Sequence, residues 1–489
     1  MGLRINTNVS SVAALRNLQA SDRNQQRSLE RLSTGLRVNG AGDDPAGLVI
    51  SEQLRAQIGS MKQALENSQN ASNLLGTTEA ALNEVNSLLI GIRESVIFAL
   101  NSGASSTEEI DAEQDSIDNA IRSIDRIAQT TKFATKNLLD GSQQISVTSQ
   151  VTSIADINVQ NVTFDGQTSQ QYTMNVTALA SQAGVFDGGT TGAVYGGTST
   201  AGATFRLSGS EGTQDISVSS ATTLAQFVDA VNAYTGDTGV FASSVGSLHS
   251  VEYGEDETVS VQVISGTLNA GGGVTSANGI ITDDGADLAG DINGITFSAR
   301  GHDVRVQSDV ITADIRVQQS ITIASTHTFT VDNSGMVFQL NHDGGANDRE
   351  QVGVRSVHTS LLGENTRTVT GINGQSLTIG GFLSSLVSGS GNDLDTNAVN
   401  ALRIVDDAIE QVSDLRAYLG AFQNQTVDSN ASSLAVALEN LTASESTIRD
   451  LDFAEETAAF TKNQILYQSG IAVLAQSNLI SQSVLTLLG

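Results

Sequence analysis

Residue types that commonly do chemistry in proteins are sparse in this sequence. No two of its five histidines stand at metal-ligand spacing; they are His249, His302, His327, His342 and His358. There is no cysteine, which excludes disulfides, thiolate metal sites and a thiol nucleophile. The patterns HExxH, GxSxG and GxxxxGK(S/T) of zinc proteases, serine hydrolases and phosphate-binding loops are absent. We therefore expect no catalytic residue, no metal and no cofactor, and classify the chain as a non-enzyme.

Acidic residues gather at two places that could in principle hold calcium. Glu252 is followed by Glu255, Asp256 and Glu257, and Asp283 is followed by Asp284. Neither place has the ligand spacing of an EF-hand loop, so a solvated acidic loop is the favoured interpretation.

The overall charge excludes several classes of partner. A net charge of −29 argues against nucleic acid, which requires clustered Lys and Arg, and against an anionic membrane surface. No stretch approaches about 20 apolar residues, so we expect no membrane insertion. The first residues, MGLRINTNVSSVAALRNLQ, contain no continuous apolar segment of the kind a cleaved signal peptide needs. The chain is either cytoplasmic or exported without such a signal.

Charge and composition divide the chain into three segments. Residues 1–140 hold 13 basic and 17 acidic side chains, residues 141–395 hold 7 and 25, and residues 396–489 hold 4 and 11. The ends are rich in Ala, Leu, Asn, Gln and Ser, whereas the middle is rich in Gly, Thr, Val and Asp. This change predicts a multidomain α + β protein, in which helical ends flank β-rich units.

Both ends show the apolar spacing of coiled coils. Near the N-terminus the repeat comprises Leu15, Leu18, Leu29, Leu32 and Leu36; near the C-terminus it comprises Leu466, Val473, Ile480, Val484 and Leu487. Such narrow stripes make a poor core alone, so these helices must pack on each other or on other copies. The first 37 residues carry six Arg against two acids, and the last 40 carry Lys462 against four, which favours pairing of the two ends. The alternative is that both ends are ordinary solvated bundle helices.

The middle alternates short strand-like runs with turn residues. Examples are VQNVTF, ITFSARG, VRVQ, TFTVD and MVFQL, and one helix is expected at residues 223–232 between strands. β-Hairpins are expected near 141–160 and 335–395.

At both ends the residues resemble one family. Residues 3–50, with Leu29-Glu-Arg-Leu-Ser-Thr-Gly35 and Asp43-Asp44-Pro45-Ala46-Gly47-Leu48 at their centre, are similar to the N-terminal region of bacterial flagellins. Asn440-Leu-Thr-Ala-Ser-Glu-Ser-Thr-Ile-Arg-Asp450 and Val473-Leu-Ala-Gln-Ser-Asn478 look like that family's C-terminal region. Residues 204–245 resemble a hairpin–helix–strand module inserted in many flagellins. The resemblance covers both termini in the right order.

This resemblance implies a structural subunit that self-assembles into the helical flagellar filament used for motility. Residues 1–45 with 450–489 would form a terminal helical inner-tube domain, and residues 46–140 with 400–449 a helical shaft domain. Residues 160–335 would form surface-exposed β-rich variable domains. The seam residues of both termini would form the subunit interface.

The same resemblance implies a set of partners. The implied partners are other copies of the chain, the flagellar export apparatus, an export chaperone, the filament cap and the hook–filament junction proteins. Ser and Thr of the outer domains could accept glycans after export. The expected location is the extracellular filament, reached without a cleaved signal peptide.

One receptor-binding surface of the family can be aligned in part. Many flagellins carry a Leu-Gln-Arg-(Ile/Val)-Arg-Glu-Leu sequence that a vertebrate innate immune receptor reads. Leu89, Ile92, Arg93 and Glu94 match it here. Ile90, Gly91 and Ser95 do not, so we expect weak or absent activation, because a lost Arg removes a frequent interface hot spot.

Two other functions stay open at this point. A hook–filament junction protein has similar terminal helices but matches the terminal motifs more loosely. An acidic coiled-coil surface adhesin would leave the ordered motifs at both ends unexplained.

Overall fold

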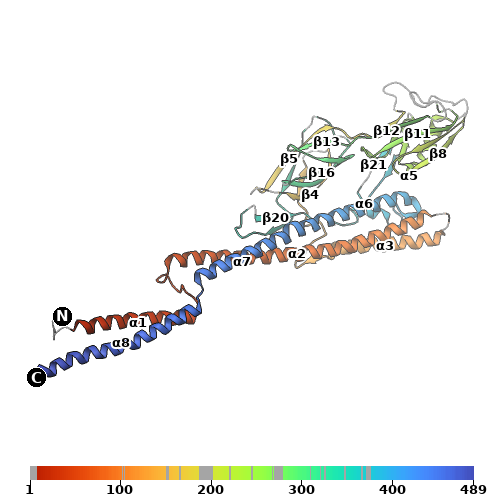
Figure 1. The fold of residues 1–489 in the computed structure, drawn as a ribbon. Helices are drawn as coiled ribbons and strands as arrows, with labels where there is room; N and C mark the ends of the chain where they lie inside the picture. Colours follow the sequence, from red (N-terminus) through yellow and green to blue (C-terminus); the bar gives the residue numbers. More distant parts are fainter. Residues whose placement is uncertain are drawn as a thin grey trace. The chain divides into compact units, whose positions relative to one another are not determined.

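The structure is a computed structural model of the chain (Figure 1). It describes residues 8–488 apart from 102, 104, 150–152, 163, 165–166, 187–201, 220–221, 244–245, 267, 269–278, 309, 320, 324–325, 346–347, 365–366 and 371–375. Side chains are not described at 149, 367–370, 376–379 and 480–488. The chain forms two compact units: one of residues up to 66, 341–343 and from 430 onward, the other of residues 67–340 and 344–429.

The first unit is built from helices whose ends are set by local chemistry. Helix α1 (Val9–Thr34) starts where the Asn8 side chain accepts a hydrogen bond from Ser11 N, and ends at Gly35, whose φ of 73° is left-handed. Helix α2 (Pro45–Leu100) begins with Pro at its first position and is capped by Asp44, whose Oδ1 accepts a hydrogen bond from Gly47 N at 2.9 Å. Helices α7 (Ser429–Arg449) and α8 (Phe453–Leu488) complete this unit.

Three helices of the second unit enclose one apolar core. They are the remainder of α2, α3 (Thr107–Thr130) and α6 (Leu394–Ala421). A separate 3-10 turn, η2 (Leu383–Leu386), precedes α6, and a π-helical stretch, η3 (Phe422–Asp428), follows it directly. Ser106 and Glu109 form a capping box at the start of α3. Ile117, Ile121 and Ile124 of α3, which recur every three or four residues, enter this core.

Two sheets of the middle segment face a common core. The first has the order β14 (Ile295–Thr296), β13 (Ala289–Ile292), β5 (Ser169–Ala178), β18 (Thr326–Asp332) and β3 (Val147–Ser149); the second has β15 (Ser298–Arg300), β16 (Asp303–Gln307), β17 (Ile311–Val317) and β4 (Ile154–Val162). Tyr172 and Phe329 stack in their core with ring centroids 5.5 Å apart.

A second β-rich part has its own core. Its sheets have the orders β12 (Ile280–Asp284), β11 (Thr258–Ser265), β7 (Ala203–Ser208), β8 (Thr213–Val218), and β6 (Gly184–Val185), β10 (Leu248–Ser250), β9 (Val240–Ala242). Helices α4 (Leu224–Asn232) and α5 (Thr235–Thr238) lie between β8 and β9 in the chain. Hairpin, helix and strand thus follow one another here in the expected order.

Three two-stranded hairpins complete the structure. They are β1 (Lys132–Phe133) with β2 (Lys136–Asn137), β19 (Met336–Gln339) with β20 (Arg349–Val352), and β21 (Arg367–Thr370) with β22 (Ser376–Ile379). Helical ends around a β-rich middle confirm the predicted fold class.

Candidate assembly surface

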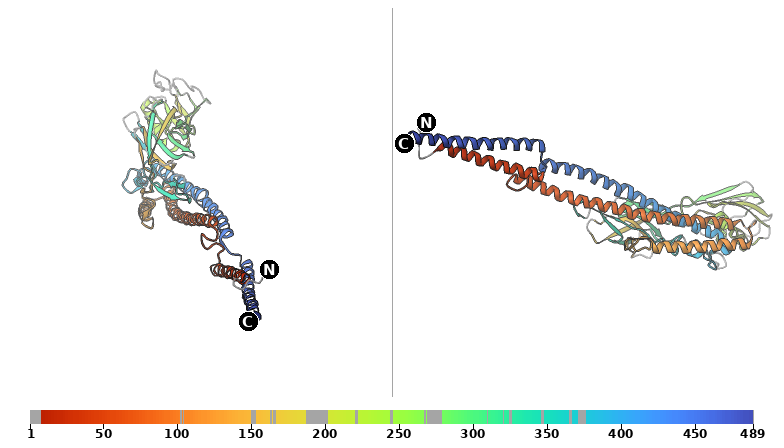
Figure 2. Two further views of the ribbon diagram at one scale, coloured as in Figure 1. Left: turned by 90° about the vertical axis from the view of Figure 1, so that its left-hand side faces the viewer. Right: turned by 90° about the horizontal axis from the view of Figure 1, so that it is seen from below.

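Helices α1 and α8 pack side by side in the first unit, with the two termini at the same end of the pair (Figures 1 and 2). The less exposed face of each helix repeats every three and four residues, as in a coiled coil. On α1 it comprises Ser11, Ala14, Leu18, Ser21, Gln25, Ser28 and Leu32; on α8 it comprises Glu456, Phe460, Asn463, Tyr467, Gly470, Leu474 and Ser477. Most of these side chains are small or polar, so the pair buries little apolar surface between its two helices.

Gly470 sets the distance between the two helices. A Cβ built on this glycine would lie 3.2 Å from Leu18 Cδ1 and 3.9 Å from Leu18 Cα. Near the termini, Asn8 Nδ2 donates to Ser477 O at 3.1 Å and Ser11 Oγ donates to Asn478 Oδ1 at 2.9 Å. Close packing and polar contacts therefore fix the register of α1 against α8.

The chain segments that follow α1 and precede α8 pair with each other. Arg37 N donates to Arg449 O at 2.7 Å, and Leu451 N donates to Gly35 O at 3.0 Å. Leu36 lies opposite Asp450 in an antiparallel bridge between these hydrogen bonds. The end of α1 and the start of α8 are therefore joined through backbone groups, which do not depend on side-chain type.

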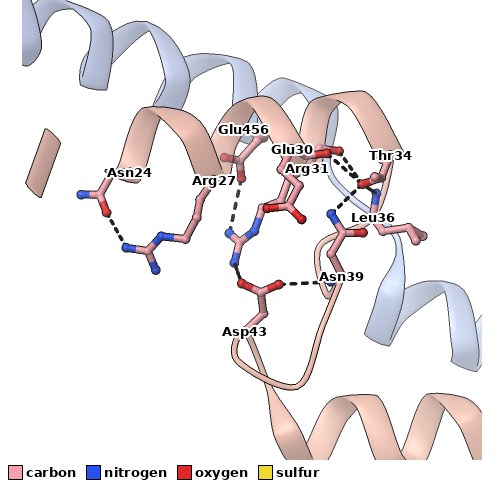
Figure 3. A network of polar contacts seen from close by, with 9 residues as sticks. All are labelled: Asn24, Arg27, Glu30, Arg31, Thr34, Leu36, Asn39, Asp43 and Glu456. Carbon is pink, nitrogen blue, oxygen red and sulfur yellow. Dashed lines mark hydrogen bonds and ion pairs between the residues drawn. The ribbon is translucent and has the colours of Figure 1, made fainter. Parts of the chain in front are cut away.

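Arg31 lies at the centre of a polar network beside this bridge (Figure 3). Its guanidinium is 3.7 Å from Asp43 Oδ1, in the loop before α2, and 3.7 Å from Glu456 Oε2 on α8. Asp43 Oδ2 also accepts a hydrogen bond from Asn39 N at 3.2 Å. One cation thus links α1, the following loop and α8, although each long, partly exposed ion pair is worth only about 0–1 kcal/mol.

Further large apolar side chains of both helices point away from the pair. The exposed large apolar residues on α1 are Val9, Val12, Leu15 and Leu29, and those on α8 are Phe453, Ile465, Leu466, Ile471, Val473 and Leu479. Leu15 and Leu29 are 44% and 49% exposed, and Leu466 and Val473 are 48% and 59% exposed. Several exposed apolar side chains on one helix pair are typical of an interaction site.

The predicted leucine stripe therefore divides between two surfaces. Leu18 and Leu32 lie between the helices and Leu36 lies in the bridge, whereas Leu15 and Leu29 lie outside the pair. Likewise Leu466 and Val473 point outward on α8. Ile480, Val484 and Leu487 are on α8, but their side chains lie outside the described residues. Ser28 is buried in the pair, a contact that a search for apolar residues misses.

The four residues aligned with a receptor surface do not share one surface. Leu89 and Ile92 are buried in the helical core of the second unit. Arg93 Nε is bonded to Asp406 Oδ1 at 2.6 Å, and this hydrogen bond raises the pKa of Arg93. Glu94 is exposed. Only Arg93 and Glu94 can reach another molecule.

The histidines contact different neighbours. His327 Nδ1 is 2.8 Å from Ser153 Oγ, and His358 Nδ1 is 3.3 Å from Asp125 Oδ1. Within the described part of the chain, no three His, Asp or Glu side chains gather where they could hold a metal ion. None of the helices described is both long and apolar enough to span a membrane.

Comparison with known proteins accounts for the two helical ends. Residues 5–144 match the bacterial flagellin N-terminal helical region, and residues 402–488 match the bacterial flagellin C-terminal helical region. A flagellin of Clostridium tyrobutyricum is 31% identical over 479 residues, which cover 97% of this chain and 98% of that protein. The chain belongs to the bacterial flagellin family.

Other relatives agree with this assignment. The B-type flagellin of Pseudomonas aeruginosa is 31% identical over 528 residues and is matched from end to end. Among solved structures, the flagellar junction protein FlgL from Legionella pneumophila is 12% identical at a TM-score of 0.28, covering 82% of this chain and 99% of that one. A likeness this loose carries no argument about function.

The chain is therefore a structural subunit of the bacterial flagellar filament, an extracellular assembly. The junction-protein alternative is not favoured, because the full-length relatives are flagellins. The β-rich middle lies outside both matched regions, so the helical ends carry the family's signature.

Proposed function

We propose that the outward-facing apolar side chains of α1 and α8 are the contacts through which copies of this chain form the inner tube of the filament. In this proposal, residues 1–45 with 450–489 are the inner-tube domain and residues 46–140 with 400–449 are the shaft. Residues 160–335 are the solvent-exposed variable domains. The observation that carries the proposal is the placement of Leu15, Leu29, Leu466 and Val473 outside the helix pair.

Burial energetics support this assignment. Burying a fully exposed Val or Leu side chain stabilises an assembly by about 1.5–3 kcal/mol, and covering these half-exposed side chains gains about half of that for each. The α1–α8 contact face offers little of this, since Ser, Gln, Asn and Gly occupy half of its positions. An isolated pair therefore gains too little to offset the entropy of ordering two long helices, whereas neighbouring copies supply the missing burial. We infer that the terminal helices order on assembly.

The remaining assignments follow from family membership. We propose export in an unfolded state without a cleaved signal peptide, with an export chaperone bound before export. The filament cap and hook–filament junction proteins are the proposed partners at the ends of the filament. We further propose that the chain has no catalytic activity and that Ser and Thr of residues 160–335 are glycan acceptors after export.

Recognition by the innate receptor is proposed to be weak. Two of the four aligned residues are buried, and Arg93 is already bound to Asp406. A receptor would have to bind through Glu94 and through Arg93, whose guanidinium is already hydrogen-bonded to Asp406.

Substituting an outward-facing residue tests the assembly proposal. Val473→Glu places a charge on the outer face of α8; Ile280→Glu, on β12, is the matched control because both residues are 59% exposed. Seeded growth from purified subunits should be abolished in Val473→Glu and unchanged in Ile280→Glu. Equal growth of the two variants would rule out this face of α8 as a subunit contact.

A further inference from the structure

Charge is separated along helix α3 and the hairpin that follows it. Residues 107–118 hold six acidic side chains and no basic one: Glu108, Glu109, Asp111, Glu113, Asp115 and Asp118. Residues 119–139 hold four basic side chains, Arg122, Arg126, Lys132 and Lys136, against Asp125. Asp125 is occupied by hydrogen bonds from Thr359 N and Oγ1.

A groove lies at the acidic end, between α2 and α3. It has a volume of about 500 Å³ and is lined by small and apolar side chains, among them Gly91, Ser116 and Phe98. Gly91 leaves open space, because a Cβ built there meets nothing within 4 Å. Phe98 is exposed, so the groove offers apolar surface to an occupant.

Two carboxylates line this groove. Glu113 Oε2 accepts a hydrogen bond from Ser95 Oγ at 2.5 Å, and Glu94 is exposed on α2. Among the residues that the structure describes, no cation forms an ion pair with either carboxylate. Acids at the start of α3 complement its helix dipole, whereas Glu94 lies six residues before the end of α2, too far from either helix end for the dipole to balance its negative charge. An incoming cation would relieve this.

At the basic end, the β1–β2 hairpin presents two lysines. Lys132 and Lys136 flank the tip of the β1–β2 hairpin, and both are exposed, as is Thr135. Ala134 in the tip has a φ of +53°, a left-handed conformation that costs a non-glycine residue about 1–3 kcal/mol. Phe133 packs on the helical core and holds the hairpin in place.

These lysines cannot reach the groove of their own chain. Between Ser116 and the end of α3 at Thr130 the helix rises about 1.5 Å per residue, roughly 20 Å in all. A lysine side chain is several times shorter than that. A second copy displaced along the helix could supply its hairpin.

We propose that the β1–β2 hairpin of one copy docks in the acidic α2–α3 groove of the next copy. Lys132 and Lys136 would lie against Glu94 and Glu113, with the hairpin tip against Phe98. The contact joins different surfaces of identical chains, so it propagates head to tail and does not close into a dimer. It rests on the proposed assembly into a filament and adds a second subunit contact, on the shaft.

The absence of cysteine gives a direct test. Ser116→Cys and Thr135→Cys are made in separate chains, mixed in equal amounts, polymerised on seeds and oxidised. A disulfide requires Cα atoms within about 7 Å, so disulfide-linked dimer in excess of that given by either cysteine chain alone reports this contact on a non-reducing gel. The dimer should form in filaments and not in the unpolymerised mixture. Gln129→Cys mixed with Thr135→Cys is the control, because Gln129 is exposed at the opposite end of α3.

Filaments that grow but give no more dimer than the control would overturn the docking proposal and leave the inner-tube proposal intact. Failure of the unmodified chain to form filaments would instead overturn the inner-tube proposal.

Charge exchange tests the same contact without cysteine. Lys136→Glu or Glu94→Lys alone should raise the critical concentration for growth about fivefold or more, since like charges then face each other. The chain carrying both substitutions should return to within about twofold of the unmodified chain. If the double variant is as impaired as the sum of the single ones, these groups do not meet and the proposal is wrong.

Discussion

Gly470 offers the sharpest test of the α1–α8 contact. Its absent side chain lets Leu18 approach, and a Cβ there would lie 3.2 Å from Leu18 Cδ1. Gly470→Leu adds three further carbon atoms into a space that Leu18 already fills. Overpacking of this kind costs about 1–3 kcal/mol, which corresponds to a factor of about 5 to 150 in an equilibrium constant.

A second effect of opposite sign must be separated from this one. Replacing any helical glycine stabilises the helix by up to about 1 kcal/mol. Gly59→Leu on α2 is the matched control, because a Cβ at Gly59 meets nothing within 4 Å. Gly470→Ala should be close to neutral, since Leu18 needs to move by only a few tenths of an ångström.

The assay is the critical concentration for growth from seeds, measured from the subunit left in solution at equilibrium. Relative to Gly59→Leu, Gly470→Leu should raise it about 5- to 150-fold, if the pair must form for assembly. If Gly470→Leu polymerises as well as Gly59→Leu, close packing of α1 on α8 is not part of the assembled state and the reasoning fails.

Three further predictions concern the second unit and its surface. Burial raises the pKa of Glu350, so its ionisation destabilises the fold: its favourable contribution is present at low pH and is lost as pH rises through the folded-state pKa. Glu350→Gln should therefore raise the melting temperature near pH 7, with the gain vanishing towards about pH 4; an equal gain at both pH values would contradict this. Burial acts to raise the pKa of Asp393, but hydrogen bonds from Thr396 outweigh burial, so the folded-state pKa is lowered. The Asp393 carboxylate therefore stabilises the start of α6 above its ordinary pKa, and this stabilisation is lost as pH falls through the folded-state pKa. Asp393→Ala should cost about 1 kcal/mol in urea unfolding at neutral pH, and a cost below about 0.3 kcal/mol would exclude a capping role. In a reporter-cell assay for the innate receptor, purified monomer should give a weak response or none; a strong response would show that Arg93 and Glu94 suffice.

The architecture was accessible from sequence because it depends on repeated patterns. Composition alone separates helical ends from a β-rich middle, and the Asp44-Pro45 pair predicts the start of α2. Strands such as β16 and β18 also follow their alternating residues, because one face of each lies on an apolar core.

The contact face of the helix pair was harder to predict. Sequence reasoning follows the largest apolar side chains, and on α1 these lead to Leu15 and Leu29, which point outward. The face against α8 instead combines Leu18, which Gly470 leaves room for, with small or polar residues such as Ser28. Helix α1 carries two overlapping stripes, one facing α8 and one facing outward. Which stripe packs against α8 depends on the residues of α8, so the sequence of α1 alone does not reveal it.

The receptor-like segment shows a different limit of sequence. Alignment matches residue types at Leu89 and Ile92, but the same leucine and isoleucine spacing also builds the core of α2. Exposed and buried positions can hold the same apolar residue types, so only the packing of α2 against α3 and α6 shows that Leu89 and Ile92 are buried.

The most direct test of the terminal helices as the assembly surface is negative-stain electron microscopy of the purified chain grown on short seeds. Three chains are compared: the full sequence, one lacking residues 1–45 and one lacking residues 450–489. The full chain should give long filaments of uniform width, and neither truncated chain should give any. If a truncated chain grows as the full one does, or if the full chain only caps the ends of seeds, α1 and α8 do not build the filament.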